Sequence, residues 1–489
     1  MMGPLSVVLF MAIVCGAGAW LASLLQDSEG GPVALGRTWL LGCAILSLAL
    51  HVPLAIEGRI THRSFGVAAA ACLGASILFM RGWWKRRSRT QWGGWLADLP
   101  LAGRLVAGAI ILAATFHALR TEFTGYDARS IFALKARILY DTGDVGGEDF
   151  RDVERVNFNP SYPLLLPLLE AETYWCQGNY EHPGLRLLFV GFVLAIVSVH
   201  ASEIRRFAPA NMAAFQALLL LLTPMMIDCG EGAGLSGSAD LPLAAFVFAG
   251  TLDLFRFSQP LTWRRVLSAG LLFGAALMTK QEGQLWVIVA AIMALGLLAA
   301  GRFGQPLLPA TRQVLPGAAV LGAAFGLHVL SHRGMPSSPY YPSYAAALTD
   351  FHWLAQVADR PPGVLLFALR ALFRTSPFSL LWPCILGSLI LLRRDAVPLE
   401  TKCWRAIVAV VAAIYLAILV ITPLHLDYQL KTTFSRLALH IFPLAMLIMA
   451  EQIVASRFLV RLLDQRPKRD EPRWLRPRGV LAERPSAAA

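Results

Sequence analysis

The sequence predicts an all-α protein that crosses a lipid bilayer many times. Of its 489 residues, 56% are hydrophobic and only 15% are charged, whereas soluble domains average about 45–50% apolar and about 25% charged residues. The mean hydropathy is +0.57. Long apolar segments recur from residue 5 almost to residue 456, and no stretch between them is long enough for a large soluble domain.

Thirteen apolar segments have the length of a membrane-spanning helix, or nearly so. A span needs roughly 20 apolar residues to cross about 30 Å of hydrocarbon, so we expect about 11–13 transmembrane helices. The first segment is interpreted as a span, because it lacks the basic start of a cleaved signal peptide. The segments are 5–25, 38–55, 64–80, 105–119, 185–204, 211–228, 239–257, 266–279, 284–301, 313–330, 375–392, 404–424 and 432–456.

The basic residues predict which side of the membrane each connection faces. The net charge is +12, and the excess lies at 81–89, in arginine pairs at 205–206, 264–265 and 393–394, and after Arg457. Because cytoplasmic loops are enriched in Lys and Arg, these clusters mark the cytoplasmic side. The charge thus reflects topology and argues against a nucleic-acid partner.

This layout divides the chain into three parts. Residues 1–100 are extra N-terminal transmembrane helices, 101–456 are the main membrane module, and 457–489 are a basic cytoplasmic tail predicted to be disordered at its end. Two long loops, at about 119–184 and 331–361, fall on the outer side. Three helices before the cluster at 81–89 place the first residues outside, which is an unusual arrangement.

The outer loop at 119–184 contains candidate helices that lie in the membrane plane. The segment 126–144 is amphipathic, with Asp127 as a candidate N-cap and Gly143 as a stop signal. Such a helix lies at the membrane interface. The segment 159–175 is a second candidate, because it is too short and too rich in proline to span.

Ionisable residues gather at the outer ends of the predicted helices. A charge at membrane depth costs at least about 2.5–3.5 kcal/mol, so such groups mark functional sites. Carboxylates beside cations suit a reaction in which a base deprotonates a hydroxyl and cations stabilise a departing phosphate. The gathered residues are Glu122, Asp127, Lys135, Asp240, Lys280, Glu282, His425, Asp427, Lys431 and Arg436.

Five short motifs occur in order within residues 105–456. They are DARSIFALKARILYDTGD (127–144), NFNPSYPLLLPLL (157–169), SADLPLAAF (238–246), TKQEG (279–283) and FSRLALHIFPLAM (434–446). Together they resemble the GT-C superfamily of membrane glycosyltransferases, in particular bacterial members related to protein O-mannosyltransferases and to the aminoarabinose transferases of lipid A. The mannosyltransferases carry an Asp–Glu pair at the start of the loop, whereas Ala128 follows Asp127 here.

The resemblance implies a glycosyltransferase of the bacterial inner (cytoplasmic) membrane, with its site on the periplasmic or outer face. The donor would be a polyprenyl-phosphate-linked sugar, and the acceptor a lipid, glycan or protein of the cell envelope. A base would deprotonate the acceptor hydroxyl, which attacks the anomeric carbon with inversion. The resemblance requires no certain cofactor and leaves a divalent metal open.

The catalytic candidates are Asp127, as the base, and Glu122, as a partial substitute for the missing second carboxylate. Helix capping is the alternative role for Asp127, and a surface ion pair with Arg120 is the alternative for Glu122.

The candidates for binding the donor phosphate are Lys280, Arg436, His440 and Lys135. Arg436 and His440 lie four residues apart, hence on one helix face. An internal ion pair is the alternative for Arg436, and an exposed pair with Glu282 is the alternative for Lys280. Lys135 could instead extend toward lipid phosphates.

Other site candidates are Asp240, Glu282, Tyr162 and His425, with helix capping as the alternative for Asp240. The rival class for the whole chain is a transporter or flippase of a lipid or envelope precursor. Carriers usually show internal repeats and charges near the midplane, whereas here no convincing repeat is found and the charges lie at helix ends. A third class is a non-catalytic assembly subunit.

Overall fold

The computed structural model consists of helices. It describes residues 3–25, 35–85, 95–151, 159–180, 183–258, 260–303, 307–333, 335, 344–374, 376–392 and 397–456. Within these ranges, the β-type pairing is limited to an isolated bridge between Arg59 and Asp144. The predicted all-α class is therefore confirmed, and the predicted tail at 457–489 lies outside the described residues.

Each of the thirteen apolar segments contains a helix. They are α1 (Gly3–Leu25), α2 (Leu35–Glu57), α3 (His62–Lys85), α4 (Leu101–Arg120), α8 (Leu187–Ile204), α9 (Ala210–Leu221), α11 (Asp240–Leu254), α12 (Trp263–Thr279), α13 (Gln281–Ala299), α14 (Leu307–Ser331), α18 (Leu381–Leu391), α19 (Leu399–Ile421) and α20 (Leu426–Ala455). Among the described residues, nine helices are long and apolar enough to cross a membrane. The four shorter ones are α9, α11, α12 and α18. The protein is therefore a multi-pass membrane protein.

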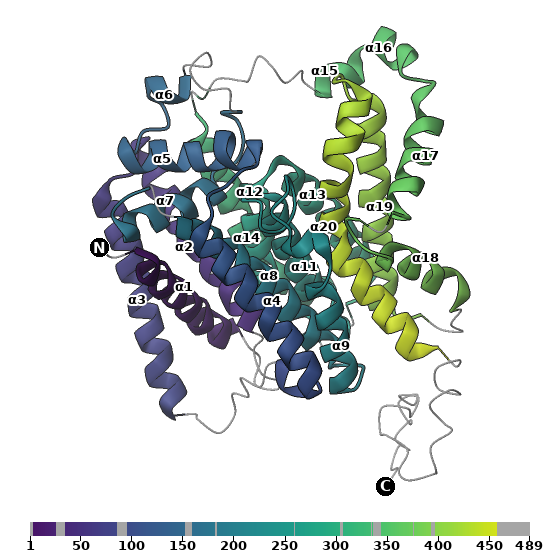
Figure 1. The fold of residues 1–489 in the computed structure, drawn as a ribbon, viewed down its shortest axis with the longest axis horizontal. Helices are drawn as coiled ribbons and strands as arrows, with labels where there is room; N and C mark the ends of the chain where they lie inside the picture. Colours follow the sequence, from purple (N-terminus) through teal and green to yellow (C-terminus); the bar gives the residue numbers. More distant parts are fainter. Residues whose placement is uncertain are drawn as a thin grey trace.

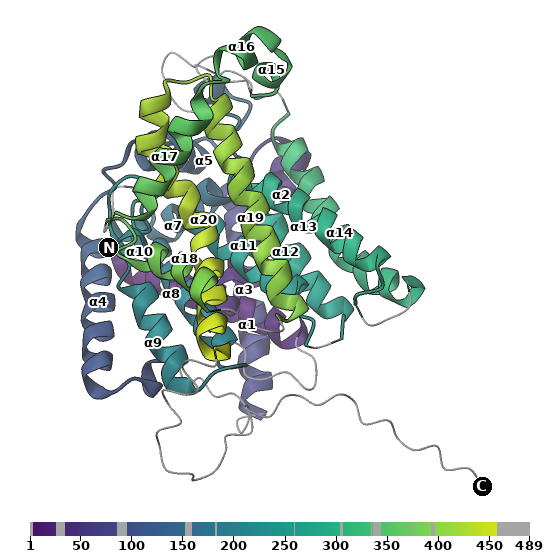
Figure 2. The ribbon, with the colours of Figure 1, turned by 90° about the vertical axis from the view of Figure 1, so that its right-hand side faces the viewer.

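The remaining helices are short and connect the long ones. They are η1 (Trp95–Asp98), η2 (Ala128–Ala133), α5 (Leu134–Asp141), α6 (Glu148–Arg151), α7 (Leu165–Gln177), η3 (Pro183–Arg186), α10 (Pro224–Ile227), α15 (Tyr344–Thr349), α16 (Phe351–Gln356) and α17 (Arg360–Leu372). Helices α5, α6, α15 and α16 lie at one end of the bundle in Figure 1, and α15 and α16 lie at the same end in Figure 2. We call this the loop end, and the opposite end, where α20 finishes, the tail end.

Contacts at the tail end fix the directions of the helices. Arg205, which follows α8, pairs with Asp98 of η1, and Arg37 of α2 lies 2.5 Å from Asp253 near the end of α11. Helices α2 and α8 therefore run in opposite directions, as the alternating layout predicts. The basic end of α3 also lies away from the loop end (Figure 1).

Helix α11 lies in the centre of the bundle. All of its residues except Leu254 are buried, and it packs on α8, α12 and α20. Its fifteen residues rise by only about 22 Å, so its two ends stop short of the membrane surfaces. Polar groups at these ends must therefore find partners inside the protein.

The loop at 119–184 contains short helices where the sequence predicts in-plane helices. Helix α5 turns Ala136 and Leu139 inward and exposes Asp141. It ends at Asp141, and Gly143, two residues later, has a φ of +68°. Gly143 also contacts the α2–α3 connection closely, because a Cβ there would lie 1.7 Å from the carbonyl oxygen of Ile60. The predicted stop at Gly143 is confirmed.

The region between α16 and α19 differs from the prediction. The sequence predicts a span over 375–392, whereas α18 covers only Leu381–Leu391. Helix α17 is not predicted, because its polar first turn and short apolar face resemble a loop. The chain bends between the two helices at Ser379, whose φ is +55°.

Glycines bring α12 and α14 into close contact, as small residues do in membrane bundles. A Cβ on Gly317 would lie 2.2 Å from the carbonyl oxygen of Val266, whereas a Cβ on Gly322 of the same helix would meet nothing within 4 Å. We expect Gly317→Val to destabilise the fold by about 1–3 kcal/mol through overpacking. Thermal unfolding in detergent measures this effect. Gly322→Val is the matched control, and an equal loss of stability in both variants would contradict the close contact.

Helix α7 buries two carboxylates, Glu170 and Glu172, whose oxygens have no hydrogen-bond partner among the described residues. Burial raises the pKa of Glu172 to about 8. The folded state therefore keeps a proton that the unfolded chain loses at lower pH, and stability falls as the pH rises from the ordinary glutamate range to about 8.

We expect Glu172→Gln to reduce this loss, because an amide does not ionise. The measurement is the unfolding temperature of wild type and variant over that pH range. Parallel pH profiles for the two proteins would show that Glu172 does not contribute.

Candidate functional site

The buried carboxylate of Asp240 is the centre of a polar cluster at the loop end. Asp240 is the first residue of α11 and is fully buried. Its Oδ1 accepts a hydrogen bond from Lys280 Nζ at 2.7 Å and lies 3.0 Å from His440 Nε2. Its Oδ2 accepts a hydrogen bond from Arg436 Nε at 2.9 Å. Three predicted cation or histidine candidates thus meet at one carboxylate.

Two further carboxylates, Asp127 and Glu282, each pair with one of the two cations. Arg436 Nη2 lies 2.5 Å from Asp127 Oδ2, and Lys280 Nζ lies 3.0 Å from Glu282 Oε1. Carboxylates and cations therefore alternate along this series of contacts. We call Asp127, Arg436, Asp240, Lys280, Glu282 and His440 the loop-end network.

Local structure turns Lys280 into this network. Lys280 separates α12 from α13 with an extended backbone, and Gly283 N–H donates to its carbonyl. Gly283 lies tightly against α12, because a Cβ there would be 2.0 Å from the carbonyl oxygen of Ala276. This tight junction keeps Lys280 buried beside Asp240. Lys280 does pair with Glu282, but the predicted alternative, in which this pair is exposed, is wrong because the lysine is buried.

Helix capping, the alternative role for the Asp127 side chain, is not observed. Asp127 occupies the N-cap position of the π-helix η2, but its side chain makes no capping hydrogen bond. Its carboxylate binds Arg436 instead, and its backbone N–H donates to Glu231 Oε1 at 3.4 Å. The expected internal ion pair of Arg436 is observed, on two carboxylates.

A glycine-rich loop, residues 228–239, covers Arg436 and was not anticipated as part of the site. Gly232 has a φ of +78°, and a Cβ there would lie 2.3 Å from Arg436 Cγ. The same loop supplies Glu231 to Asp127. The sequence signal was present as four glycines between residues 230 and 237.

Lys135 lies outside the loop-end network, because its Nζ donates to the carbonyls of Pro160 at 3.2 Å and Tyr162 at 3.0 Å. It is fully buried, so it does not extend toward lipid. Burial lowers its pKa well below the ordinary lysine value. Tyr162 stacks on Phe132 of η2, the short helix that Asp127 precedes, so it lies near the network.

Two other candidates lie apart from the network. The Glu122 side chain is exposed, and only its backbone carbonyl has a structural role, as acceptor for Arg186 Nη2 at 2.6 Å. The expected pair with Arg120 is not among the ion pairs of the described residues. His425, at the start of α20, is exposed.

Sequence reasoning also missed a buried pair that reaches the network. Tyr415 of α19 lies with its hydroxyl 2.9 Å from His440 Nδ1, and the indole Nε1 of Trp286 donates to that hydroxyl at 2.9 Å. Both side chains lie within apolar segments, where an isolated aromatic residue gives no functional signal.

The expectation that charges gather only at one end is wrong. At the tail end, Asp253 pairs with Arg37, while Glu203 pairs with Arg206 and, at 2.6 Å, with Arg256. These residues are buried or half-buried. We call these five residues the tail-end network. From the sequence, such arginines are interpreted only as markers of the cytoplasmic side, and their ion pairs inside the protein are not predicted.

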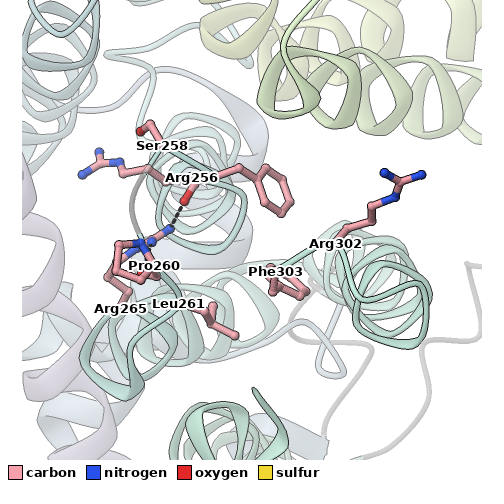
Figure 3. Close-up of a pocket in the computed structure, with 8 residues that line it drawn as sticks. Arg256, Ser258, Pro260, Leu261, Arg265, Arg302 and Phe303 are labelled. Atoms are coloured by element: carbon pink, nitrogen blue, oxygen red, sulfur yellow. Dashed lines mark hydrogen bonds between the residues drawn. The ribbon is translucent and has the colours of Figure 1, made fainter. Parts of the chain in front are cut away.

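A pocket of about 240 Å³ lies beside the tail-end network (Figure 3). Arg265 donates to the backbone carbonyls of Asp253, Arg256 and Pro260 and so satisfies the end of α11. The Arg302 side chain lies apart from Arg256 and Arg265 in Figure 3. Two of the three arginines of the pocket thus have structural roles, and the loop-end network remains the better candidate site.

The part of the chain that the structure describes contains no group of three or more His, Cys, Asp or Glu side chains that could hold a metal ion. Comparison of the chain with protein-family models, curated proteins and solved structures finds no match.

Removal of Asp240 tests how far the network depends on this carboxylate. We expect Asp240→Ala to destabilise the protein by about 3–5 kcal/mol, because it leaves Lys280 and Arg436 buried beside an empty space. Thermal unfolding in detergent measures the change. Asp427→Ala is the control, since Asp427 is exposed on the first turn of α20. A small effect of Asp240→Ala, equal to that of the control, would contradict the central role of Asp240.

Proposed function

We propose that the protein is a membrane glycosyltransferase that uses a polyprenyl-phosphate-linked sugar. The observation that carries this proposal is the loop-end network itself. Two cations, the half-buried Arg436 and the buried Lys280, are held on one carboxylate, and a second carboxylate, Asp127, lies within ion-pair distance of Arg436. A base beside two cations is the arrangement that transfer from a phosphate-linked donor requires.

The two cations retain donors for a phosphate. Arg436 uses Nε for Asp240 and Nη2 for Asp127, so its Nη1 group has no partner among the described residues. Lys280 has three N–H donors and uses two, for Asp240 and Glu282. The departing polyprenyl phosphate would take up these donors, and its negative charge would be stabilised in a site with little water.

The two aspartates have different capacities to accept a proton. Asp240 is saturated, because both oxygens are engaged by Lys280, Arg436 and His440. Asp127 binds Arg436 through Oδ2, and its Oδ1 has no partner among the described residues. In the proposed reaction, Asp127 takes the proton of the acceptor hydroxyl. The hydroxyl oxygen bonds to the anomeric carbon, whose bond to the phosphate oxygen breaks.

The membrane setting supports a lipid-linked donor and an outer site. A polyprenyl donor would enter from the bilayer, and the loop-end network includes Asp127, which directly precedes η2 and α5. Helix α5 lies at the loop end of the bundle (Figure 1). The end of α3, which carries Arg81, and the 205–206 arginine pair lie toward the tail end, which the positive-inside rule assigns to the cytoplasm. The loop end then faces outward, on the periplasmic side of a bacterial inner membrane, where the envelope acceptor would be.

A transfer assay in reconstituted membranes tests the proposal. The assay offers radiolabelled polyprenyl-phosphate sugars together with an extract of envelope lipids, glycans and proteins. We expect label to move to an acceptor with the wild type, and transfer to fall by about 10²–10⁴ in Asp127→Asn, the usual contribution of a general base.

Asp427→Asn is the matched control and should keep wild-type activity, because this exposed aspartate lies outside the network. Thermal unfolding shows whether each variant is folded. Normal turnover by folded Asp127→Asn would remove Asp127 as the base. Absence of transfer by the wild type with every donor of the panel would count against the proposed activity.

One observation favours the rival function, movement of a lipid or envelope precursor across the membrane. Helix α11 carries Asp240 in the loop-end network and Asp253 in the tail-end network, so ion pairs could close the bundle at both ends. The same reconstituted membranes decide between the two functions. Movement of a labelled lipid precursor between leaflets, without any change in its covalent structure, would support a flippase.

A further inference from the structure

A hydrogen-bonded chain of four buried side chains leads to the loop-end network from the side of α13 and α19. Trp286 Nε1 donates to the Tyr415 hydroxyl at 2.9 Å, and this hydroxyl lies 2.9 Å from His440 Nδ1. His440 Nε2 lies 3.0 Å from Asp240 Oδ1. All four residues are at most 4% exposed, so water does not replace these partners.

The two ends of the chain together set the direction of its hydrogen bonds, because Trp286 can only donate and the Asp240 carboxylate can only accept, here from His440 Nε2. An indole N–H can only donate, so the Tyr415 oxygen accepts from Trp286. The tyrosine proton is then free to point at His440 Nδ1, which accepts it. With Nδ1 as acceptor, the imidazole proton resides on Nε2 and is donated to Asp240. Each buried donor along the chain thus has an acceptor.

We infer that Trp286 and Tyr415 are positioning residues that hold His440 as a neutral imidazole with its proton on Nε2, directed at Asp240. This inference rests on the proposed function for its catalytic meaning, but the hydrogen-bond chain can be tested without it. The charged groups around His440 are Asp240 of α11, Lys280 and Glu282 at the α12–α13 junction, and Arg436 one turn away on α20.

A neutral His440 determines which groups of the network can bind the donor phosphate and which group anchors the cations. It adds no positive charge, so the donor phosphate depends on Lys280 and Arg436 alone. It also completes the hydrogen bonds of Asp240 Oδ1, which Lys280 shares. Asp240 is thereby fixed as the anchor of both cations. Loss of the chain should loosen this anchor and weaken donor binding, while the base, Asp127, remains in place.

Nitrogen NMR of the wild-type protein in bilayers tests the chain directly. The protein is labelled with ¹⁵N in its histidine side chains, and the His440 signals are identified by their loss in His440→Asn. We expect Nδ1 to resonate as an unprotonated nitrogen and Nε2 as a protonated one at neutral pH. A His440 signal with Nδ1 protonated, or with both nitrogens protonated, would overturn the inference.

Kinetics of Tyr415→Phe test the functional meaning. We expect the KM for the donor to rise about tenfold, the equivalent of one lost hydrogen bond of about 1.4 kcal/mol, with a smaller change in kcat. Tyr174→Phe is the matched control, because Tyr174 is buried to a similar extent and lies on α7, outside the chain. An equal change in both variants, or a fall in kcat alone, would contradict the positioning role.

Trp286→Phe gives a second variant in case Tyr415→Phe does not fold. It removes the donor to the Tyr415 oxygen, so this oxygen can accept a hydrogen bond from His440 Nδ1. The His440 nitrogen signals should then shift toward the form with both nitrogens protonated, since Asp240 still accepts from Nε2. Unchanged His440 signals in Trp286→Phe would refute the role of Trp286. The two proposals fail separately: the NMR result stands or falls without any transfer, and transfer can be observed whatever the tautomer of His440.

Discussion

The structure of the loop end depends on one buried carboxylate, that of Asp240. A carboxylate at this depth is tolerated only when its charge is matched and its oxygens are bonded, and Asp240 meets both conditions through Lys280, Arg436 and His440. All three partners lie outside α11: Arg436 and His440 on α20, and Lys280 at the α12–α13 junction. These contacts therefore also join α11 to α20 and to that junction. Arg436 extends the connection to η2 through Asp127. The position of the in-plane helices over the bundle is thereby coupled to the electrostatics of its core.

Helix α11 explains why charges are buried at both ends of the molecule. It has fifteen residues, which is too few for a full span of about 20 residues, and longer helices enclose it. Asp240 at its start and Asp253 near its end therefore lie below the two membrane surfaces, where each needs a cation. The arginines of α2, of the segment after α8 and of the segment after α11 supply positive charge at the tail end. Ion pairs of this kind hold a short central helix in one register, which in turn fixes the position of Asp240.

The sequence predicts the bundle well because hydropathy alone identifies helices that must satisfy their backbone in lipid. It also predicts that Asp127, Asp240, Lys280 and Arg436 gather, since each lies where an apolar segment begins or ends at the same face. It is harder to predict which partner each charged side chain binds. Lys135 has the same charge and setting as Lys280, yet it binds the carbonyls of Pro160 and Tyr162, because the segment 159–163 folds over α5. Tyr415 lies in an unbroken apolar run, where only tertiary contacts reveal its role.

Arg436 binds two carboxylates, and these two contacts distinguish a fixed part of the site, Asp240, from a part that can move, Asp127. Its Nε binds Asp240 and its Nη2 binds Asp127, so the second contact can break without loss of the first. Asp240 is buried among three donors, whereas Asp127 stands at the start of a short π-helix and is 14% exposed. In the proposed reaction, a phosphate bound at Nη1 of Arg436 would lie beside the Nη2 contact with Asp127 and away from the Nε contact with Asp240. The cations would then stay in place while the base turns to the acceptor hydroxyl, because the interaction that anchors them is not the one that restrains the base.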